Sequence, residues 1–317
     1  MLTPHSPAVA ALGGGHGLAA SLSALRLMTD RITAIVTVAD DGGSSGRLRR
    51  ELDVLPPGDL RMALAALCDD TQWGKTWSSL LQYRFNSNGA LDNHAMGNLL
   101  IVALWDQLGD SVVGLDWVGK LLNARGRVLP MATVPLNIEA DVVIQGKTKL
   151  VTGQAHVAGA KGTVKQVRLF PANPPVCEEA VTAILEADWI VLGPGSWFSS
   201  VMPHLVVPQI RQAISESNGK RCLTLNLVNE TAETVGMSVT DHLRAIQDHA
   251  PELKFDVVVA DPSAVDDLDE LSSAVSDIGA KLLLRQVSIG DGTERHDALR
   301  LAAAYRDAFV GAISDIE

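Results

Sequence analysis

The pattern of apolar and polar positions begins with a strand–helix–strand unit. Residues 8–12 (AVAAL) form a short apolar run that three glycines end, which predicts a buried strand. Apolar residues at helical spacing then predict a helix over 17–28, and the β-branched run 32–38 (ITAIVTV) predicts a second strand. Strands joined through a helix pair in parallel, so this unit predicts a parallel sheet covered by helices.

Helical and strand patterns continue to alternate through most of the chain. Further helices are predicted after Asp59 and at about 76–85, 95–108, 114–123, 176–187, 203–217, 239–249 and 296–310. Further strands are predicted at 189–192, 221–227, 255–260 and near 281–285. We therefore predict an α/β fold of the Rossmann-like, doubly wound type, with a mostly parallel sheet.

The pattern changes near residue 127, where apolar and polar residues alternate and glycines separate the segments. These segments are 134–145, 148–158 and 163–170, and they predict antiparallel hairpins. We accordingly expect an N-terminal nucleotide-binding half at 1–126, a small antiparallel β insertion at 127–172, and the C-terminal half of the same domain at 173–317.

Composition and charge narrow the class of protein. Aromatic residues make up only 4% of the 317 residues, and aliphatic residues dominate, which suits buried parallel strands. The formal net charge of −11 argues against binding nucleic acid, because a phosphate backbone requires a basic surface. An unidentified protein partner and a homo-oligomer both remain compatible with this composition.

The sequence shows no pattern typical of disulfide bonds, a signal peptide or a transmembrane helix. The three cysteines have no paired spacing and no CxxC occurs, so we expect neither disulfides nor a zinc site. The N-terminus lacks a basic leader, and the apolar run 99–105 is too short to span a bilayer. We expect a cytoplasmic protein that is not inserted into a membrane.

The first motif that carries chemistry is GGGHGLAA at 13–20. Gly15, Gly17 and Ala20 match the dinucleotide fingerprint in its Gly/Ala form, and Gly14 precedes them between a strand and a helix. Glycines let the backbone approach a phosphate, and the helix N-terminus offers free N–H groups. The alternative is tight packing of helix on strand. His16 could contact a phosphate, or could simply begin the helix.

The second motif, ADDGGSSGRLRRE at 39–51, lies in a polar stretch that runs from about 40 to 58. Its glycines permit a backbone nest for an anion, its serines add donors, and its arginine suits a phosphate. The two acids could hold ribose hydroxyls or a divalent cation such as Mg²⁺. The candidate residues are Asp40, Asp41, Gly42, Gly43, Ser44, Ser45, Gly46 and Arg47. The alternative is a solvated loop.

Three further motifs place polar residues after a strand or at a helix start. Asn98 (in HAMGNL) could bind a base or a sugar, although the surrounding residues could equally cap a helix. The loop LGPGS, with Gly193, Gly195 and Ser196, would line a ligand crevice at the carboxyl end of a strand, or form a plain turn. Asn226 and Asn229, at and after the end of the predicted strand 221–227, could bind a ribose or a base. Because Asn226 lies inside the strand end, a structural role is about as plausible for it.

Several catalytic signatures are missing from the sequence. It contains no GxxxxGK[ST], GxSxG or HExxH motif, and its histidines are scattered. We therefore assign no catalytic residue and no metal ligand from the sequence alone.

The motifs together resemble those of the CofD/YvcK family. The resemblance rests on GGGHGL, VADDGGSSGRLR, HAMGNL, LGPGS and RHDALRLA, which span nearly the whole chain. One branch of that family is the 2-phospho-L-lactate transferases. The other is the gluconeogenesis factors, which bind UDP-sugars such as UDP-N-acetylglucosamine and are needed for cell shape and envelope growth on gluconeogenic carbon sources. The GGSSGRLR run and the chain length look more like the second branch.

The resemblance implies a UDP-sugar-binding regulatory protein without turnover. The positions that it implicates in binding are Gly14, Gly15, Gly17, Asp40, Asp41, Ser44, Ser45, Arg47, Asn98, Gly195 and Ser196. Two departures are His16, where the family has threonine, and NETAET at 229–234, where it typically has TQPGET. Two alternatives stay open. One is a phospholactate-type transferase with Mg²⁺, in which Asp40 or Asp41 would act in catalysis, and the other is an NAD(P)-dependent oxidoreductase.

Overall fold

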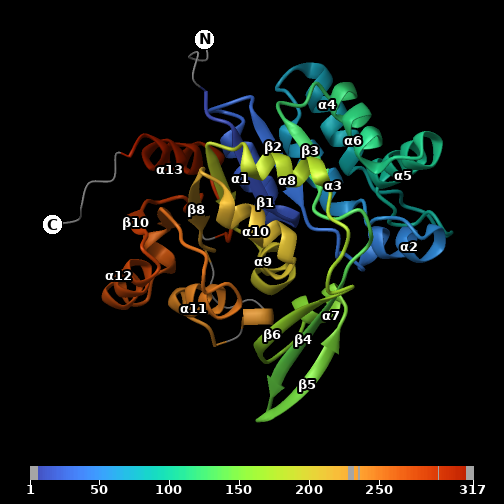
Figure 1. Ribbon diagram of the computed structural model, residues 1–317. Helices are drawn as coiled ribbons and strands as arrows, with labels where there is room; N and C mark the ends of the chain where they lie inside the picture. The colour runs from blue at the N-terminus through green and yellow to red at the C-terminus, as the bar shows by residue number, and fades with distance from the viewer. Residues whose placement is uncertain (1–5, 228–231, 235, 292, 312–317) are drawn as a thin grey trace.

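Seven parallel strands form the central sheet of the computed structural model, which describes residues 6–311 except 228–231, 235 and 292 (Figure 1). Their order across the sheet is β10-β9-β8-β7-β1-β2-β3. The strands are β1 (Val9–Gly13), β2 (Ile32–Val36), β3 (Arg127–Pro130), β7 (Trp189–Leu192), β8 (Lys220–Thr224), β9 (Val257–Ala260) and β10 (Lys281–Leu284). Strands β1, β7 and β9 are buried along their whole length. The predicted α/β fold with a mostly parallel sheet is confirmed.

Strand β1, at the centre of the sheet, is the point at which the chain changes from adding strands on one side to adding them on the other. From β1 the chain adds β2 and then β3 on one side, and it returns to place β7 on the other side of β1. The loops that leave the carboxyl ends of β1 and β7 therefore diverge. In open α/β sheets, a crevice that binds ligands forms at such a point.

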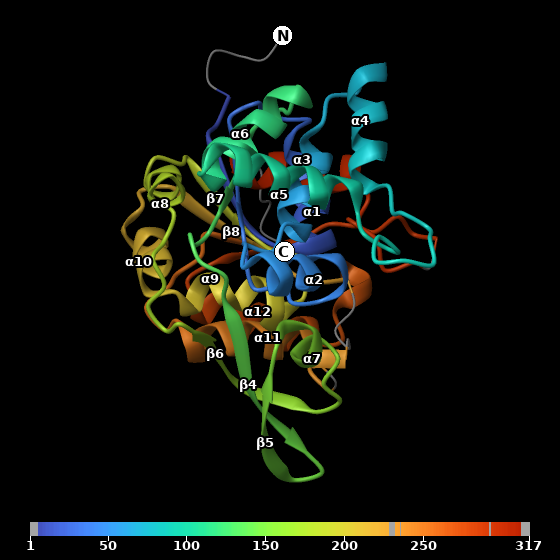
Figure 2. The same cartoon turned by 90° about the vertical axis from the view of Figure 1, so that its right-hand side faces the viewer.

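Helices cover both faces of this sheet (Figures 1 and 2). Helices α1, α3 and α13 pack together on one face, while α8 and α10 pack on the other. The helices are α1 (Gly15–Leu25), α2 (Gly43–Leu52), α3 (Gly58–Leu67), α4 (Gln72–Gln82), α5 (Met96–Leu108), α6 (Ser111–Leu121), α7 (Gln154–Ala158), α8 (Glu178–Leu185), α9 (Met202–Val206), α10 (Pro208–Glu216), α11 (Val239–His249), α12 (Leu268–Asp277) and α13 (Ala298–Val310).

A second, three-stranded antiparallel sheet projects from the body (Figure 2). It consists of β4 (Asn137–Ile144), β5 (Lys147–Thr152) and β6 (Thr163–Phe170) in the order β5-β4-β6, and α7 follows β5. We call residues 137–170 the lobe. The hairpin between β4 and β5 turns at Gln145 and Gly146, which have φ values of 49° and 75°. Two consecutive residues with positive φ are typical of a type I′ turn, which matches the twist of the paired strands.

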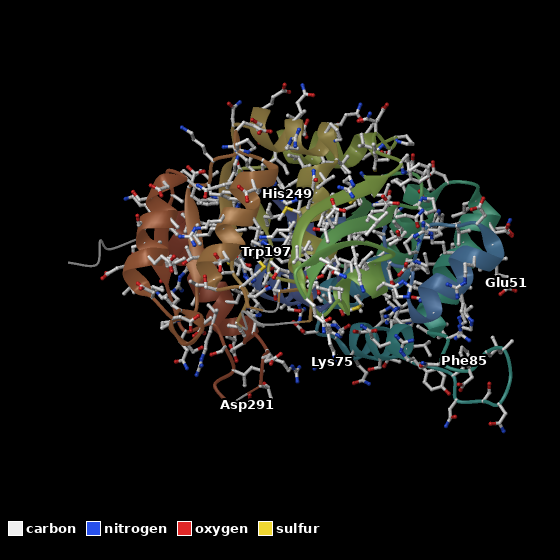
Figure 3. All side chains as sticks on the ribbon, turned by 90° about the horizontal axis from the view of Figure 1, so that it is seen from below. Glu51, Lys75, Phe85, Trp197, His249 and Asp291 are labelled. Carbon is white, nitrogen blue, oxygen red and sulfur yellow. The ribbon has the colours of Figure 1, made fainter. Side chains whose placement is uncertain are left out.

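The lobe is attached to the body along β6. In the neighbouring strand β4, Ile138, Ala140 and Val142 are fully buried. The N–H of Val167 in β6 donates to Nε2 of His249 in α11 at 3.3 Å. In the view from below, His249 and Trp197 lie beside the lobe strands (Figure 3). One edge of the small sheet is thus fixed to the body.

Two features of the fold differ from the sequence-based expectation. Strand β3 lies within the predicted insertion 127–172, but it pairs with β2 in the main sheet. Residues 43–52, in the stretch expected to be a polar loop, form the helix α2. Leu48 of this helix is buried, and its burial stabilises a helix that Gly43 and Gly46 disfavour.

Candidate functional site

The first glycine-rich loop turns directly from β1 into α1. Gly14 precedes the helix without any side-chain cap, and Gly15 begins it at φ +56°. A Cβ atom at Gly14 would lie 2.6 Å from Oδ2 of Asp59, and one at Gly17 would lie 2.2 Å from the carbonyl oxygen of Pro194. These glycines are therefore required by close contacts of the backbone with neighbouring segments.

The second glycine-rich loop follows β7 and lies against the first. Asn226, at the end of the neighbouring strand, forms two hydrogen bonds with Gly195. The Gly195 N–H donates to Oδ1 of Asn226, and Nδ2 of Asn226 donates to the Gly195 carbonyl, both at 2.9 Å. Gly193 has φ +76° and accepts a hydrogen bond from the Ser21 hydroxyl at 2.9 Å. The amide of Asn226 thus fixes the backbone of this loop.

A cavity of about 1120 Å³ opens between the two loops at the carboxyl end of the sheet. Eight of the residues singled out from the sequence line it: Gly14, Gly15, His16, Gly17, Asp40, Gly195, Ser196 and Asn226. The structure therefore brings together the ends of β1, β2, β7 and β8, as the topology requires. This cavity is the candidate ligand site.

Three acidic residues line this cavity, Asp40, Asp59 and Glu294, and the pKa values of the two aspartates are shifted. Burial, and after it the neighbouring Asp40 carboxylate, raise the pKa of Asp59 to about 7, against the lowering effect of the Gly15 N–H. Burial also raises the pKa of Asp40, although hydrogen bonds from Gly42 and Ser45 oppose it. The Gly42 N–H donates to Oδ1 of Asp40 at 3.0 Å. Two acids with raised pKa values in a cleft are typical of a functional site.

Residues from the C-terminal part of the chain complete the cavity wall. Arg295 lines it and brings a permanent positive charge. His296 lines it too, and burial lowers its pKa to about 4, so its imidazole is neutral at physiological pH. Nε2 of His296 is buried and has no hydrogen-bond partner among the described residues. A ligand in the cavity would supply that partner.

Sequence reasoning missed several of these residues as site residues. From the sequence, Asp59 only marks the start of a predicted helix, yet in the structure it faces the start of α1 from the first turn of α3. Gln154, Ser200, Arg295 and His296 also line the cavity. The RHDALRLA motif, which begins at Arg295, was the available signal for the last two.

Asp41 points away from the cavity and toward the lobe. Its Oδ1 accepts a hydrogen bond from the Ala155 N–H at 2.9 Å. A Cβ atom at Gly153 would lie 2.5 Å from its Oδ2. Asp41 therefore links the loop after β2 to the first turn of α7.

Ser44 and Asn98 belong to a buried polar network instead of the cavity wall. Nδ2 of Asn98 donates to the Ser44 hydroxyl at 3.0 Å, and Oδ1 of Asn98 accepts from Nε of Arg61 at 2.9 Å. The Ser44 hydroxyl also bonds to Nδ1 of His94 at 3.0 Å. Arg61 is only 3% exposed, and a further hydrogen bond joins it to Gln82. This network joins α2, α3 and α5.

The remaining predicted residues lie as follows. Arg47 donates to the carbonyls of Ala90 and Asp92, at 3.3 and 2.6 Å, and so holds the loop before α5. None of Gly42, Gly43, Ser45, Gly46 and Gly193 is among the residues that line the cavity. Asn229 lies outside the described residues.

We expect Asn98→Ala to lower the free energy of unfolding by about 2 kcal/mol, because Arg61 and Ser44 would lose buried partners. Urea unfolding measures this loss. Ligand affinity of the folded variant should stay within about twofold of the wild type, since the Asn98 amide lies outside the cavity wall. A variant of unchanged stability that lost ligand affinity would contradict this assignment.

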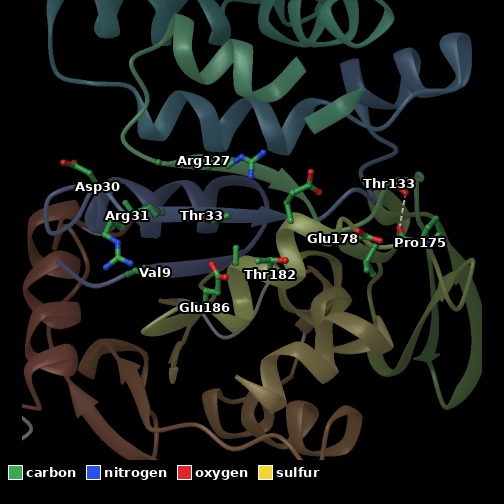
Figure 4. A pocket seen from close by; sticks show the side chains of 17 residues that line it. Val9, Asp30, Arg31, Thr33, Arg127, Thr133, Pro175, Glu178, Thr182 and Glu186 are labelled. Atoms are coloured by element: carbon green, nitrogen blue, oxygen red, sulfur yellow. Dashed lines mark hydrogen bonds between the residues drawn. The ribbon is translucent and has the colours of Figure 1, made fainter. Parts of the chain in front are cut away.

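A second hollow, of about 1070 Å³, lies at the opposite end of the sheet (Figure 4). It is lined by the starts of β1 and β2 and by α8. Both of its arginines are already paired: Arg127 forms two hydrogen bonds of 2.8 Å with the Asp116 carboxylate, and Arg31 lies 3.8 Å from the Asp188 carboxylate. With no glycine-rich loop of the sequence motifs in its wall, this hollow is the weaker candidate.

Neither a metal-binding cluster nor a membrane-spanning helix is found in the part of the chain that the structure describes. No group of three or more histidine, cysteine, aspartate or glutamate side chains is arranged to hold a metal ion. No helix is both long and apolar enough to cross a bilayer.

Comparison with known proteins gives consistent matches. Residues 9–277 match the profile of the family described as 2-phospho-L-lactate transferase CofD. A protein of Mycobacterium tuberculosis, provisionally named a gluconeogenesis factor, is 47% identical over 93% of this chain and 88% of its own length. The gluconeogenesis factor of Bacillus subtilis is 38% identical over 77% of this chain and 75% of its own length. A crystal structure of a Bacillus halodurans protein superposes with a TM-score of 0.85 and 34% identity, and covers 94% of this chain and 98% of that one.

Proposed function

This chain belongs to the CofD family, and from that premise we propose that it is a regulatory protein of the gluconeogenesis-factor type that binds a UDP-sugar such as UDP-N-acetylglucosamine. In this proposal it acts in the cytoplasm, through a protein partner, in cell shape and envelope growth on gluconeogenic carbon sources. The names of its relatives support this choice over the transferase branch.

The observation that carries the proposal is the junction of the two glycine-rich loops at the switch point of the sheet. The N-terminus of α1 attracts the negative charge of a diphosphate. Arg295, which also lines the cavity, would supply a compensating positive charge. The cavity extends to Asn226 and His296, which leaves room for a nucleoside on one side of the diphosphate and a sugar on the other.

In this proposal Mg²⁺ binds together with the nucleotide sugar, because the negative diphosphate would otherwise be repelled by the carboxylates of Asp40 and Asp59. Mg²⁺ is usually held by one or two carboxylates together with substrate phosphates. Asp40 and Asp59 would hold it here, and the ion would neutralise charge between them and the ligand. Ligand-dependent order in the two loops would then change the surface offered to a partner.

A second candidate function is phospholactate-type transfer. It is favoured by the Asp59 carboxyl, whose pKa of about 7 suits a general base that takes a proton from an acceptor hydroxyl. Asp40 remains a candidate residue for that chemistry because it lines the cavity, whereas Asp41 is directed to α7. Product formation from a deazaflavin acceptor and a nucleotide-activated donor would establish this reading.

The test is a thermal-shift and calorimetric screen against UDP, UDP-N-acetylglucosamine, UDP-glucose, GTP and NAD, each with and without Mg²⁺. We expect the UDP-sugars to stabilise the protein, since a ligand at 100 times its Kd contributes about 2.7 kcal/mol. Arg295→Ala should weaken the binding of UDP-N-acetylglucosamine about tenfold, because it removes a positive charge from the cavity wall. Arg306→Ala, an exposed arginine outside the cavity, is the matched control.

Stabilisation by NAD or GTP in place of the UDP-sugars would contradict the proposal. Equal losses of affinity in the Arg295 and Arg306 variants would contradict the proposed role of Arg295 in binding the diphosphate.

A further inference from the structure

The small sheet of the lobe has one covered edge and one free edge. Strand β6 lies against the body, where His249 takes the N–H of Val167. Strand β5 pairs with β4 alone among the described strands, and five of its six residues are exposed. An exposed edge presents a row of backbone N–H and C=O groups that can pair with another strand.

The charge of the lobe is opposite to that of the body. It carries five basic and two acidic residues, a formal charge of +3, in a chain whose net charge is −11, so the remainder carries −14. Lys147, Lys149, Lys161 and Lys165 are all exposed. Within the described part of the chain none of these lysines forms an ion pair, while the lobe's Arg168 pairs with Asp141 at 2.6 Å.

These charges exclude two kinds of occupant for the free edge. Pairing of β5 with β5 of a second copy would bring the lysines of both strands together, and like charges on paired strands are destabilising. A nucleic acid would meet the positive lobe but also the strongly acidic remainder of the molecule. A short acidic segment avoids both penalties.

We propose that β5 is the docking edge for an acidic, extended segment of a partner protein, which adds to the small sheet as a fourth strand. Backbone hydrogen bonds along the edge would supply the pairing. Lys147 and Lys149, two residues apart, point to the same face and would meet acidic side chains of the added strand. Leu150, 59% exposed, points to the other face and would contact an apolar side chain.

The same edge is connected to the candidate ligand site. Gly153 follows β5 directly and lies against the Asp41 carboxylate, which also accepts the Ala155 N–H. Gln154, between them, lines the cavity. A ligand that orders the loop at Asp40 would also order the end of β5, so ligand and partner would strengthen each other's binding. This coupling, unlike the docking itself, rests on the proposed function.

The experiment measures fluorescence anisotropy of the full-length protein with a short labelled peptide in which glutamate and valine alternate. We expect Lys147→Glu/Lys149→Glu to weaken binding about tenfold. The control Lys254→Glu/Lys281→Glu, which makes the same charge change at exposed lysines outside the lobe, should bind as the wild type does. A peptide in which proline replaces valine should not bind, because proline cannot complete the ladder.

Equal binding by both lysine variants, or full binding of the proline peptide, would overturn the docking edge. Light scattering that shows wild-type dimers abolished by the Lys147/Lys149 substitutions would assign the edge to a second copy and would also overturn it.

UDP-N-acetylglucosamine with Mg²⁺ should raise the affinity for the peptide on the order of fivefold in the wild type. In Asp41→Ala the affinity for the peptide should be unchanged by the nucleotide sugar. The nucleotide thermal shift is read separately, so failure of ligand binding is distinguishable from failure of the edge. A wild-type protein that binds both molecules without mutual effect would overturn the coupling.

Discussion

Gly17→Ala is expected to lower the free energy of unfolding by about 3 kcal/mol and to abolish nucleotide-sugar binding. The added Cβ would lie 2.2 Å from the carbonyl oxygen of Pro194 and 2.4 Å from Cα of Gly195. Both are backbone atoms, so no side-chain rotation can relieve the contact. The two glycine-rich loops would have to separate, and the cavity between them would change shape.

Denaturant unfolding and calorimetric titration with UDP-N-acetylglucosamine measure the two effects of Gly17→Ala. Gly89→Ala is the control, because a Cβ atom there would meet nothing within 4 Å. If the Gly17 variant matched the control in stability, the close approach of the loops would be disproved. Stability lost with ligand affinity intact would show that the junction matters for folding only.

Asp59→Asn is expected to stabilise the protein at pH 8 by about 2–4 kcal/mol. The pKa of Asp59 is raised to about 7 in the fold from an ordinary value of 3.8. A carboxyl group whose pKa is higher in the folded state favours folding while it is protonated. Its contribution is therefore complete below about pH 4 and is lost as the pH rises to 7 and above, whereas asparagine stays neutral throughout.

Urea unfolding between pH 5 and 8 tests this prediction. The difference between variant and wild type should grow by about 1 kcal/mol per pH unit up to about pH 7 and then level off. Asp30→Asn, at an exposed aspartate, should show no such trend. Under the proposed function the Asp59 variant should also lose the Mg²⁺ dependence of ligand binding. A difference that is independent of pH would contradict the raised pKa of Asp59.

The opposed effects on stability and ligand binding expected for Asp59 are characteristic of a binding site. A half-buried acid next to Asp40 weakens the fold at neutral pH, yet in the cavity wall it can bind a cation or a proton. Stability alone would favour asparagine at this position.

The strands and their glycine-rich loops could be predicted from the sequence because their signals are local. The runs at 8–12 and 189–192 are apolar and are followed directly by glycine, and the mostly apolar run 32–38 is followed by Ala39 and two aspartates. The carboxyl ends of parallel strands meet at one edge of a sheet. That rule alone predicts that Gly15, Gly195 and Asp40 lie close together, and in the structure they line one cavity.

The remaining parts of the site depend on contacts between distant segments. Asp59 follows a Pro-Pro-Gly turn and matches a helix cap, and only the packing of α3 on α1 brings it to the cavity. Ser44 and Asn98 match ligand-binding motifs, but they bond to each other in the interior, where Asn98 also accepts a hydrogen bond from Arg61. In α2, Gly46 resembles a loop residue, although a Cβ there would lie 1.8 Å from the Asp41 carbonyl oxygen.

The central position of β1 has a consequence for how the chain emerges from the ribosome. One side of β1 pairs with β2, which is made almost at once, but the other pairs with β7, which begins about 180 residues later. At roughly 5–20 residues per second, that edge stays unpaired for about 10 to 35 s of synthesis. The most buried strand of the finished sheet is thus, during translation, an open apolar edge, and the nascent N-terminal half is the stage at which aggregation or chaperone capture would occur.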